Sequence, residues 1–370
     1  MSVNVCLPSY SIGADCYKDI AFYTRHFGSK VVVIGGKTAM EKSKDALLEG
    51  IADSNLEVLD FIWYGGNSSY ENGDALIANP VVQEADMIFG VGGGRACDTV
   101  KYVASEMDKP YCLFPTVGSN CASVTAIGVM YHADGSFKDY YYPQLPVHTF
   151  INSQIIAESP AEMLWAGIGD ALSKECEAVF SSKNDDLAHT PLMGVQLSKI
   201  CTEPLLTYGR AAMEACRANT NNHALEQVVL DIIISTGLVS NMTTNMPMYY
   251  YNSSLAHCVY YGATVTKNGH KHRHGEIVSL GVLCLLTYDK QYEQRDRLMQ
   301  FNASMGLPVC FDDIDIDESE FELMADKTVT GDEWKFRSKD ITTEGFIACM
   351  KEQNAVGRAF KAQQQAAVCE

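Results

Sequence analysis

Apolar and polar positions in the first part of the chain alternate between short β-branched runs and longer stretches with helical spacing. Four apolar runs, bounded by glycine, proline or polar residues, predict buried strands at 31–34, 56–63, 85–91 and 111–114. A helical stretch at 38–48 follows the first run. Because strands that alternate with helices form βαβ units, the pattern predicts a parallel sheet. Residues 124–131 and 137–142 flank a turn at Asp134-Gly135 and predict a β-hairpin added to that sheet.

Helical spacing dominates after about residue 160, and strand-like runs nearly vanish. The predicted helices there include 161–181, 193–206, 209–218 and 224–242. A chain of 370 residues is also too long for one ordinary core. We therefore expect an α/β nucleotide-binding domain at 1–158, with a Rossmann-like parallel sheet, followed by an all-α domain at 159–370.

A glycine-rich turn follows the third predicted strand. Gly92, Gly93 and Gly94 lead directly into a helix that begins near Arg95. Glycines let backbone N–H groups close on a pyrophosphate, and the helix N-terminus adds positive potential. Alone, the cluster fits a plain tight turn as well, and it departs from the usual G-x-G-x-x-G spacing. The next strand ends in a Pro/Gly/Ser loop at 115–120, and two such loops at adjacent strand ends favour a nucleotide site.

Two histidines and one aspartate suggest a metal site. His257 and His274 lie seventeen residues apart, and Asp170 lies upstream in a Gly-Ile-Gly-Asp motif. Three protein ligands leave one position open, which is typical of a catalytic metal rather than a structural one. Glycines between the two histidines, Gly262 and Gly269, would place them on separate elements. With nine histidines in the chain, the alternative of ordinary surface or core histidines stays open on spacing alone.

Composition narrows the classes of partner. A net charge of −18 and a pI near 4.9 exclude nucleic acid and an anionic membrane face as expected partners, because phosphate groups would be repelled. No segment of the sequence is expected to supply the roughly 20 apolar residues of a membrane helix, and the N-terminal residues do not resemble a signal peptide. Thirteen cysteines without a Cys-x-x-Cys pair indicate reduced thiols in a cytoplasmic protein.

Several motifs in a fixed order carry a family resemblance. They are Gly92-Gly-Gly-Arg-Ala-Cys-Asp98 with Lys101, Pro115-Thr116 with Ser119, Gly167-Ile-Gly-Asp-Ala-Leu172, Ala256-His257 and His274-Gly-Glu276. Together they resemble the iron-containing alcohol dehydrogenase superfamily and, within it, the glycerol dehydrogenase-like branch. The resemblance covers essentially the whole chain. It implies a dehydroquinate synthase-like architecture, with a metal and a nicotinamide cofactor in the cleft between the two domains.

The resemblance also implies an activity, a ligand set and a cofactor site. Hydride would pass between NAD(P)(H) and a small alcohol, diol or carbonyl compound whose oxygen takes the open metal position, in a homo-oligomer. Asp170, His257 and His274 would act through one divalent metal. The implied cofactor residues are Gly36, Lys37, Gly92, Gly93, Gly94, Arg95, Asp98, Lys101, Thr116, Ser119, Thr125, Ile127 and Tyr131. For Lys101, the residues alone favour a solvated surface lysine, because it lies six positions after Arg95 on another helix face.

Three positions depart from the family pattern. The iron-type fourth ligand, a histidine four residues after the aspartate, is Lys174 here, so zinc fits better than iron or manganese. The aspartate that meets polyol hydroxyls in glycerol dehydrogenases is Cys121, a poor acceptor, which puts glycerol in doubt. The acid that usually binds the adenosine ribose is replaced by Gly36, followed by Lys37 and Thr38, so NADP(H) is expected to be accepted.

Two alternatives come from other functional classes. The same architecture hosts lyases of the dehydroquinate synthase kind, which use NAD transiently and need basic residues around the metal. The chain has 28 basic residues, and few of them cluster near the motifs. A non-catalytic nucleotide-binding protein is the other alternative, and the intact metal trio argues against it.

Overall fold

The computed structural model describes residues 7–335 and 341–369, which form two compact units. The first contains the chain up to Leu164 together with Ala211–Asn241, and the second contains Trp165–Arg210 and the chain from Met242 onward. The chain therefore passes between the units three times, rather than once after residue 158. Residues of the 211–241 segment join the first unit because they pack on its loops: Asn241 Nδ2 donates to the Val124 carbonyl at 3.0 Å.

A six-stranded parallel sheet forms the centre of the first unit. Its order is β1 (Tyr10–Ile12), β8 (His148–Ile151), β5 (Tyr111–Pro115), β4 (Met87–Gly92), β2 (Lys30–Gly35) and β3 (Glu57–Trp63). The four strands predicted from apolar runs are confirmed. The two added strands, β1 and β8, are three and four residues long. Runs that short show no hydrophobic period of their own, which is why the sequence pattern did not predict them.

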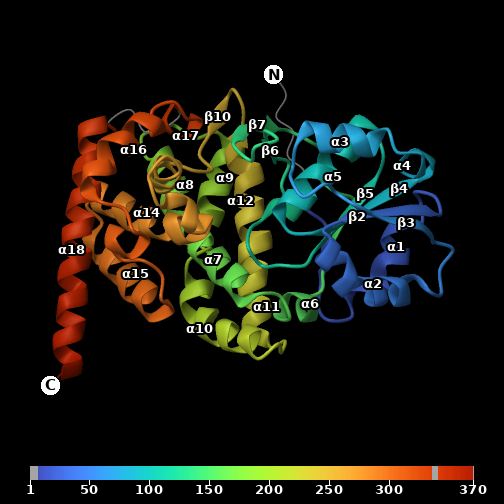
Figure 1. Ribbon diagram of the computed structural model, residues 1–370, viewed down its shortest axis with the longest axis horizontal. Coiled ribbons are helices and arrows are strands. Elements are labelled where there is room, and N and C mark those ends of the chain that lie inside the picture. Colours follow the sequence, from blue (N-terminus) through green and yellow to red (C-terminus); the bar gives the residue numbers. More distant parts are fainter. Residues whose placement is uncertain (1–6, 336–340, 370) are drawn as a thin grey trace. The chain divides into compact units, whose positions relative to one another are not determined.

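Helices cover both faces of this sheet, as Figure 1 shows. Val31 and Val33 face a core with α1 (Ile20–Thr24) and α2 (Lys37–Ile51). Val32 and Ile34 face the opposite core, with α3 (Tyr70–Ile77), α4 (Pro80–Glu84) and α5 (Gly94–Glu106). Because both faces are buried, β2 is a continuous apolar run without polar alternation. Burial on two sides thus explains the sequence pattern from which the parallel sheet was predicted.

The predicted hairpin exists but does not join this sheet. β6 (Gly128–Tyr131) and β7 (Phe137–Tyr141) pair antiparallel in a two-stranded sheet of their own. β6 packs against α5, which itself covers one face of the main sheet. The edges of the main sheet are β1 and β3, so the expectation of an added hairpin was wrong in its placement.

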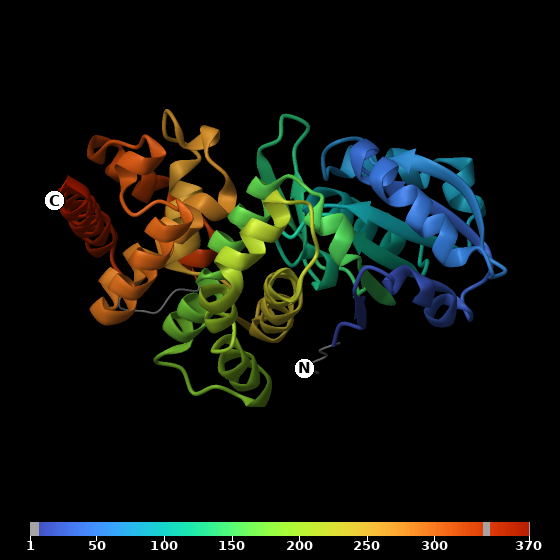
Figure 2. The same cartoon turned by 90° about the horizontal axis from the view of Figure 1, so that it is seen from below.

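The second unit is almost entirely helical. Its helices are the end of α7 (Ala161–Ala171), α8 (Ser173–Ser182), α9 (His189–Ser198), the start of α10 (Glu203–Arg217), α13 (Leu255–Ala263), α14 (His274–Tyr288), α15 (Tyr292–Met305), α16 (Phe321–Thr328), α17 (Asp332–Lys335) and α18 (Thr343–Cys369). Figure 2 shows α18 in red beside the orange helices, and it packs on α14 and α16. Two short strands, β9 (Thr244–Asn245) and β10 (Tyr249–Tyr250), are a minor exception to the all-α prediction.

One predicted helix has different boundaries. Residues 193–206 were expected to be continuous, but α9 ends at Ser198 and α10 starts at Glu203. The chain turns between them, where the Cys201 N–H donates to the Ser198 carbonyl at 3.0 Å. The predicted helix at 209–218 belongs to α10, which also includes residues 203–206, so the break between the two helices lies before residue 203 rather than after residue 206.

A continuous helix at 223–243 is the central apolar helix of the first unit. It comprises α11 (His223–Leu230), a π-helical turn (Asp231–Ser235) and α12 (Thr236–Thr243). By length and composition this 21-residue helix could cross a membrane, which corrects the expectation that no such segment exists. However, 61% of its apolar window is buried inside the protein. Its apolar character is therefore that of a core helix.

Candidate functional site

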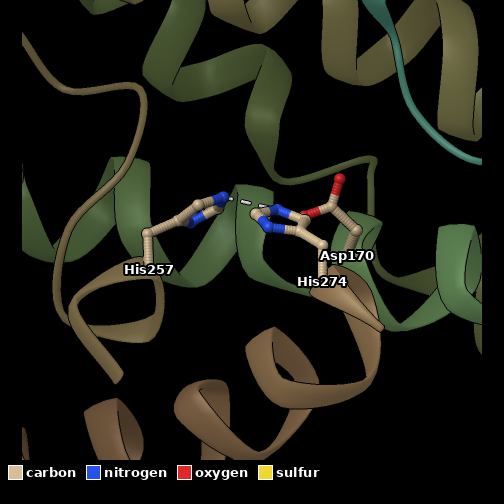
Figure 3. A group of neighbouring side chains, drawn as sticks. All are labelled: Asp170, His257 and His274. Atoms are coloured by element: carbon tan, nitrogen blue, oxygen red, sulfur yellow. Dashed lines mark hydrogen bonds and ion pairs between the residues drawn. The ribbon is translucent and has the colours of Figure 1, made fainter. Parts of the chain in front are cut away.

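Asp170, His257 and His274 converge from three separate helices of the second unit. Asp170 lies in the last turn of α7, His257 in the first turn of α13, and His274 is the first residue of α14. Asp170 Oδ1 lies 3.1 Å from His274 Nε2 and 3.6 Å from His257 Nε2. Figure 3 shows the three side chains pointing toward one another. Over residues 7–335 and 341–369, this is the one group of three such side chains with donor atoms within 4.8 Å.

Glycines on α7 and α14 allow Asp170 and His274 to come together. A Cβ at Gly275 would overlap the Ala166 carbonyl oxygen and would lie 2.9 Å from the Asp170 nitrogen. A Cβ at Gly169 would likewise meet the Gly275 carbonyl oxygen. The two backbones therefore touch directly, and only residues without a side chain permit that approach. This contact holds the start of α14, with His274, against the end of α7.

A second close crossing positions His257. A Cβ at Gly281 would overlap the Ala256 carbonyl oxygen, so α14 also lies directly on the first turn of α13. The imidazole rings of His257 and His274 are 5.2 Å apart, and the edge of Tyr260 meets His274 at 4.1 Å between ring centroids. Helix crossings, rather than loop geometry, thus fix all three side chains.

Charge at this cluster is strongly organised. Burial would raise the pKa of Asp170, but the two histidines outweigh burial and lower it to about 2. Burial likewise opposes charge on His257, but the Glu177 and Asp170 carboxylates raise its pKa overall. An ionised carboxylate beside two imidazole nitrogens is a donor set that borderline divalent cations prefer. The side chains are 22%, 14% and 40% exposed for Asp170, His257 and His274, so a ligand has access.

Glu177 is a site residue that the sequence did not single out. Its side chain is completely buried, and Oε2 lies 2.7 Å from His257 Nδ1. Its Oε1 accepts the backbone N–H groups of Ser254 at 2.7 Å and His257 at 3.0 Å. These bonds and His257 outweigh its burial, so the pKa of Glu177 is lowered. A signal was present in the sequence: Glu177 lies seven residues after Asp170, so a continuous helical pattern would place both on the same side.

Lys174, at the position of the iron-type fourth ligand, belongs to the surroundings of the site. Its side chain is almost fully buried, and Nζ donates to the carbonyl oxygen and to Oδ1 of Asn252, at 3.1 and 2.6 Å. An ammonium group does not donate a lone pair to a metal. The trio therefore stays a three-donor group at this position.

The other two histidines near the trio in sequence do not join it. His270 is exposed, and His272 Nδ1 is bound to Glu276 Oε1 at 3.0 Å. Both side chains therefore lie outside the trio.

In the first unit, the predicted glycine turn lies at the point where the strand order reverses. β2 lies between β3 and β4, and the Gly36 N–H donates to the Val91 carbonyl at 3.2 Å. The loops after β2 and β4 are therefore neighbours, and α5 begins at the second of them, with Gly93 as its N-cap. Open α/β sheets bind nucleotides at such a switch point. The surface here is a shallow hollow lined by Gly92, Gly93, Gly94, Cys97, Pro115, Val117, Asn120 and Ser123.

Further predicted cofactor residues surround this turn. Arg95 is exposed, and its guanidinium lies 5.0 Å from the centroid of the Tyr131 ring. Thr116 is buried at the end of β5, whereas Ser119 is half-buried in the following loop. Lys37 begins α2, and its ammonium lies 4.5 Å from the centroid of the exposed Trp63 ring. These side chains belong to the same edge of the sheet as the glycine turn.

The buried network around Lys101 overturns the interpretation of a solvated lysine. Lys101 is 0% exposed, and Nζ donates to Asp98 Oδ1 at 3.0 Å, Thr125 Oγ1 at 3.2 Å and the Ile127 carbonyl at 2.6 Å. Asp98 Oδ2 accepts the Val129 N–H at 3.2 Å. The structure thus brings four predicted cofactor residues together, but it uses their polar atoms to tie α5 to the segment at 125–129.

Cys121 is half-buried at the start of the short 3-10 turn Ala122–Val124. A Cβ at Gly237 would lie 3.4 Å from its Cβ, so α12 packs beside it. Every other cysteine side chain that the structure describes is buried, and none of these cysteines forms a disulfide. This agrees with the interpretation of reduced thiols.

The sequence and the fold of this chain are similar to those of known alcohol dehydrogenases and related reductases. A model of the iron-containing alcohol dehydrogenase family matches residues 8–152. The chain is 31% identical over 308 residues to a glycerol dehydrogenase of Thermotoga maritima, covering 80% of this chain and 82% of that protein. It is 27% identical over 318 residues to a glycolaldehyde reductase of Halobacterium salinarum, covering 84% and 85%. The crystal structure of glycerol dehydrogenase from Schizosaccharomyces pombe has a TM-score of 0.86 at 23% identity, covering 98% of this chain and 94% of that one.

Proposed function

The chain belongs to the iron-containing alcohol dehydrogenase superfamily, in its glycerol dehydrogenase-like branch, and on that premise we propose that Asp170, His257 and His274 hold its catalytic metal. It is a metal-dependent oxidoreductase that uses NAD(H) to interconvert alcohols and carbonyl compounds. The observation that supports the proposed ligands is their convergence, with donor atoms within 4.8 Å of one another. The histidine and carboxylate donors and the absence of a fourth ligand at Lys174 favour zinc over iron or manganese.

The metal trio and the glycine turn are proposed to have different roles in the reaction. When bound, the metal supplies a Lewis acid for the substrate oxygen, and the nicotinamide supplies or accepts the hydride. The ionised Asp170 balances part of the cation's charge, and the helix crossings hold the two imidazoles in place before the cation arrives. We assign the pyrophosphate to the backbone N–H groups at Gly93–Arg95, at the N-terminus of α5.

The substrate is proposed to be a small alcohol, diol, aldehyde or 2-oxo compound other than glycerol. Cys121 presents a thiol where glycerol dehydrogenases carry an aspartate, and a thiol accepts hydrogen bonds from hydroxyl groups weakly. The dehydrogenases and reductase compared above do not favour the lyase or the non-catalytic alternative. The homo-oligomeric state and the cytoplasmic location remain proposals, the second supported by mostly buried thiols that form no disulfide among the described residues.

Metal removal tests the function as a whole. We expect chelation to abolish turnover of a panel of small alcohols, diols, aldehydes and oxoacids, followed by absorbance of the reduced nicotinamide. Restoring Zn²⁺ should recover more activity than Fe²⁺ or Mn²⁺. Turnover that persists after complete metal removal, verified by elemental analysis, would show the proposed role of the trio to be wrong.

Cofactor choice is proposed to include NADP(H). No acid follows β2 in the loop Gly35-Gly36, so nothing there repels a 2′-phosphate, and Lys37 at the start of α2 carries a positive charge. We expect kcat/KM with NADPH to equal or exceed that with NADH. Lys37→Ala should lower kcat/KM for NADPH by about tenfold, equivalent to one charged hydrogen bond, and leave NADH unchanged. A strong preference of the parent enzyme for NADH would contradict the proposal.

A further inference from the structure

One face of α8 contacts the segment that leads into His257. Lys174, Glu177 and Ser181 are three and four residues apart, so they lie on one side of the helix. Lys174 Nζ donates to Asn252, and Ser181 Oγ donates to the Tyr251 carbonyl at 3.3 Å. The Glu177 carboxylate, between them, accepts from Ser254 and His257, while the Glu177 backbone carbonyl accepts the Ser181 hydroxyl at 2.7 Å. The loop before α13 is therefore anchored at three successive points by polar side chains of a single helix.

The carboxylate of Glu177 divides its two oxygens between two tasks. Oε1 accepts two backbone N–H groups in the first turn of α13, which alone would be an ordinary helix cap. Oε2 is used separately, at 2.7 Å from His257 Nδ1. A carboxylate that is ionised offers only acceptors, so the hydrogen of this bond has to come from the imidazole. The proton of neutral His257 is thereby held on Nδ1, and the lone pair is left on Nε2, the atom that faces Asp170.

We propose that Glu177 is a positioning residue that selects the tautomer of His257 and so prepares Nε2 to bind a divalent cation. The inference rests on the proposed metal site and adds to it a residue that contacts the ligand His257 rather than the metal. Hydrogen bonding to the distal nitrogen also orients the ring and strengthens the imidazole as a ligand. Lys174 and Ser181 hold the loop on either side, so the backbone that carries His257 moves little when the cation binds.

Glu177→Gln is the decisive substitution because it keeps the size and the cap but reverses one hydrogen bond. The amide oxygen of glutamine accepts the Ser254 and His257 N–H groups, which leaves the amide NH₂ facing Nδ1. An NH₂ group only donates, so Nδ1 has to accept, and the proton of the ring moves to Nε2. We expect the Zn²⁺ affinity of the metal-stripped protein, measured by competition with a chromophoric chelator, to fall about 10- to 100-fold. In the metal-free protein, at alkaline pH where His257 is neutral despite its raised pKa, ¹⁵N chemical shifts should report an Nδ1–H ring in the parent and an Nε2–H ring in the variant.

Two further variants separate tautomer selection from loosening of the helix. Ser181→Ala removes a bond of the same α8 face without touching His257, and it should leave Zn²⁺ affinity within about twofold of the parent. Glu177→Asp keeps an acceptor-only group, so it should retain the Nδ1–H ring and lose less affinity than Glu177→Gln. Saturating Zn²⁺ should restore much of the kcat of Glu177→Gln with little change in KM for the alcohol.

The outcomes distinguish this inference from the proposed function. Unchanged Zn²⁺ affinity and an unchanged ring tautomer in Glu177→Gln would overturn the role of Glu177. An equal loss of Zn²⁺ affinity in Ser181→Ala would show that Glu177 acts only by capping α13, not by selecting the tautomer of His257. Tight Zn²⁺ binding by the parent without any alcohol turnover would leave the role of Glu177 intact and contradict the proposed function. A parent that binds no divalent cation would overturn both.

Discussion

Asp170→Ala is expected to lower kcat/KM by about a thousandfold or more, which corresponds to ~4 kcal/mol of transition-state stabilisation. Asp170 is the negatively charged member of the trio, and it lies 3.1 and 3.6 Å from the Nε2 atoms of His274 and His257. Without it, two neutral imidazoles remain to hold a doubly charged cation. Steady-state kinetics and the metal content of the purified variant measure the effect. A variant that keeps more than a tenth of the activity, or a full complement of metal, would contradict the assignment.

The fold should survive this substitution in neutral solution. Because the folded pKa of Asp170 is lowered to about 2 from an ordinary value of 3.8, its contribution to stability is present above pH 4 and is lost as the pH falls toward 2. That contribution depends on charged histidines, which become neutral on metal binding. Glu203→Ala is a matched control, since Glu203 is an exposed carboxylate paired with Arg297 in the same unit. It should keep full activity, and both variants should give the far-ultraviolet circular dichroism of the parent.

The parallel sheet could be predicted because its central strands are buried on two faces. Positions 31–34 of β2 and every position of β4 are apolar, and each strand runs into glycines; a Cβ at Gly35 would overlap the Val91 carbonyl oxygen of the neighbouring strand. The membership of 211–241 in the first unit could not be predicted. It depends on contacts such as that between Asn241 and the segment around Val124, more than a hundred residues apart. Local periodicity carries no information on pairings of that kind.

The candidate site was partly visible in the sequence for a similar reason. Histidine and aspartate are common metal ligands, so the trio could be predicted as a candidate metal site before its geometry was known. The residues that bring the trio together are less visible: Gly275 acts through a backbone crossing, and Glu177 is one of many acidic residues until its partner is known. The burial of Lys101 was missed because a charged residue with helical spacing fits a solvated face equally well.

Asp231 gives the second large prediction, because its carboxyl group is buried without a charged partner. It is 2% exposed in the π-helical turn, and apart from the nearby Ser235 hydroxyl no described residue offers its oxygens an ion pair or a hydrogen bond. Burial raises its pKa to about 8, and the hydroxyl of Ser235 opposes this only in part. The folded protein therefore keeps a proton on Asp231 at pH values where the unfolded chain has already lost it.

The sign of the resulting pH dependence follows from linkage. Below pH 4 Asp231 is protonated in both the folded and the unfolded state, so it adds no pH-dependent penalty to the free energy of unfolding. Between pH 4 and 8 the folded state binds one proton more than the unfolded state, so the free energy of unfolding falls by about 1.4 kcal/mol per pH unit. At pH 7 the accumulated penalty is on the order of 4 kcal/mol, and above pH 8 it stays at its full value. Stability that this group supplies at low pH is thus lost on the way to neutrality.

Asp231→Asn should remove this penalty and stabilise the protein by ~2–4 kcal/mol at pH 7, since asparagine has the same shape and no charge in either state. Near pH 4 the difference should vanish, because protonated aspartic acid and asparagine then pay a similar cost for a buried polar group. Thermal unfolding of parent and variant at pH 4, 5.5, 7 and 8.5 measures the difference, and the comparison at each pH cancels the other titrating groups. Asp326→Asn, at an exposed position of α16, is the matched control and should shift the melting temperature little at any pH. A difference in melting temperature between parent and Asp231→Asn that does not change with pH would contradict the prediction. It would mean that the Asp231 carboxyl group is ionised in the folded protein.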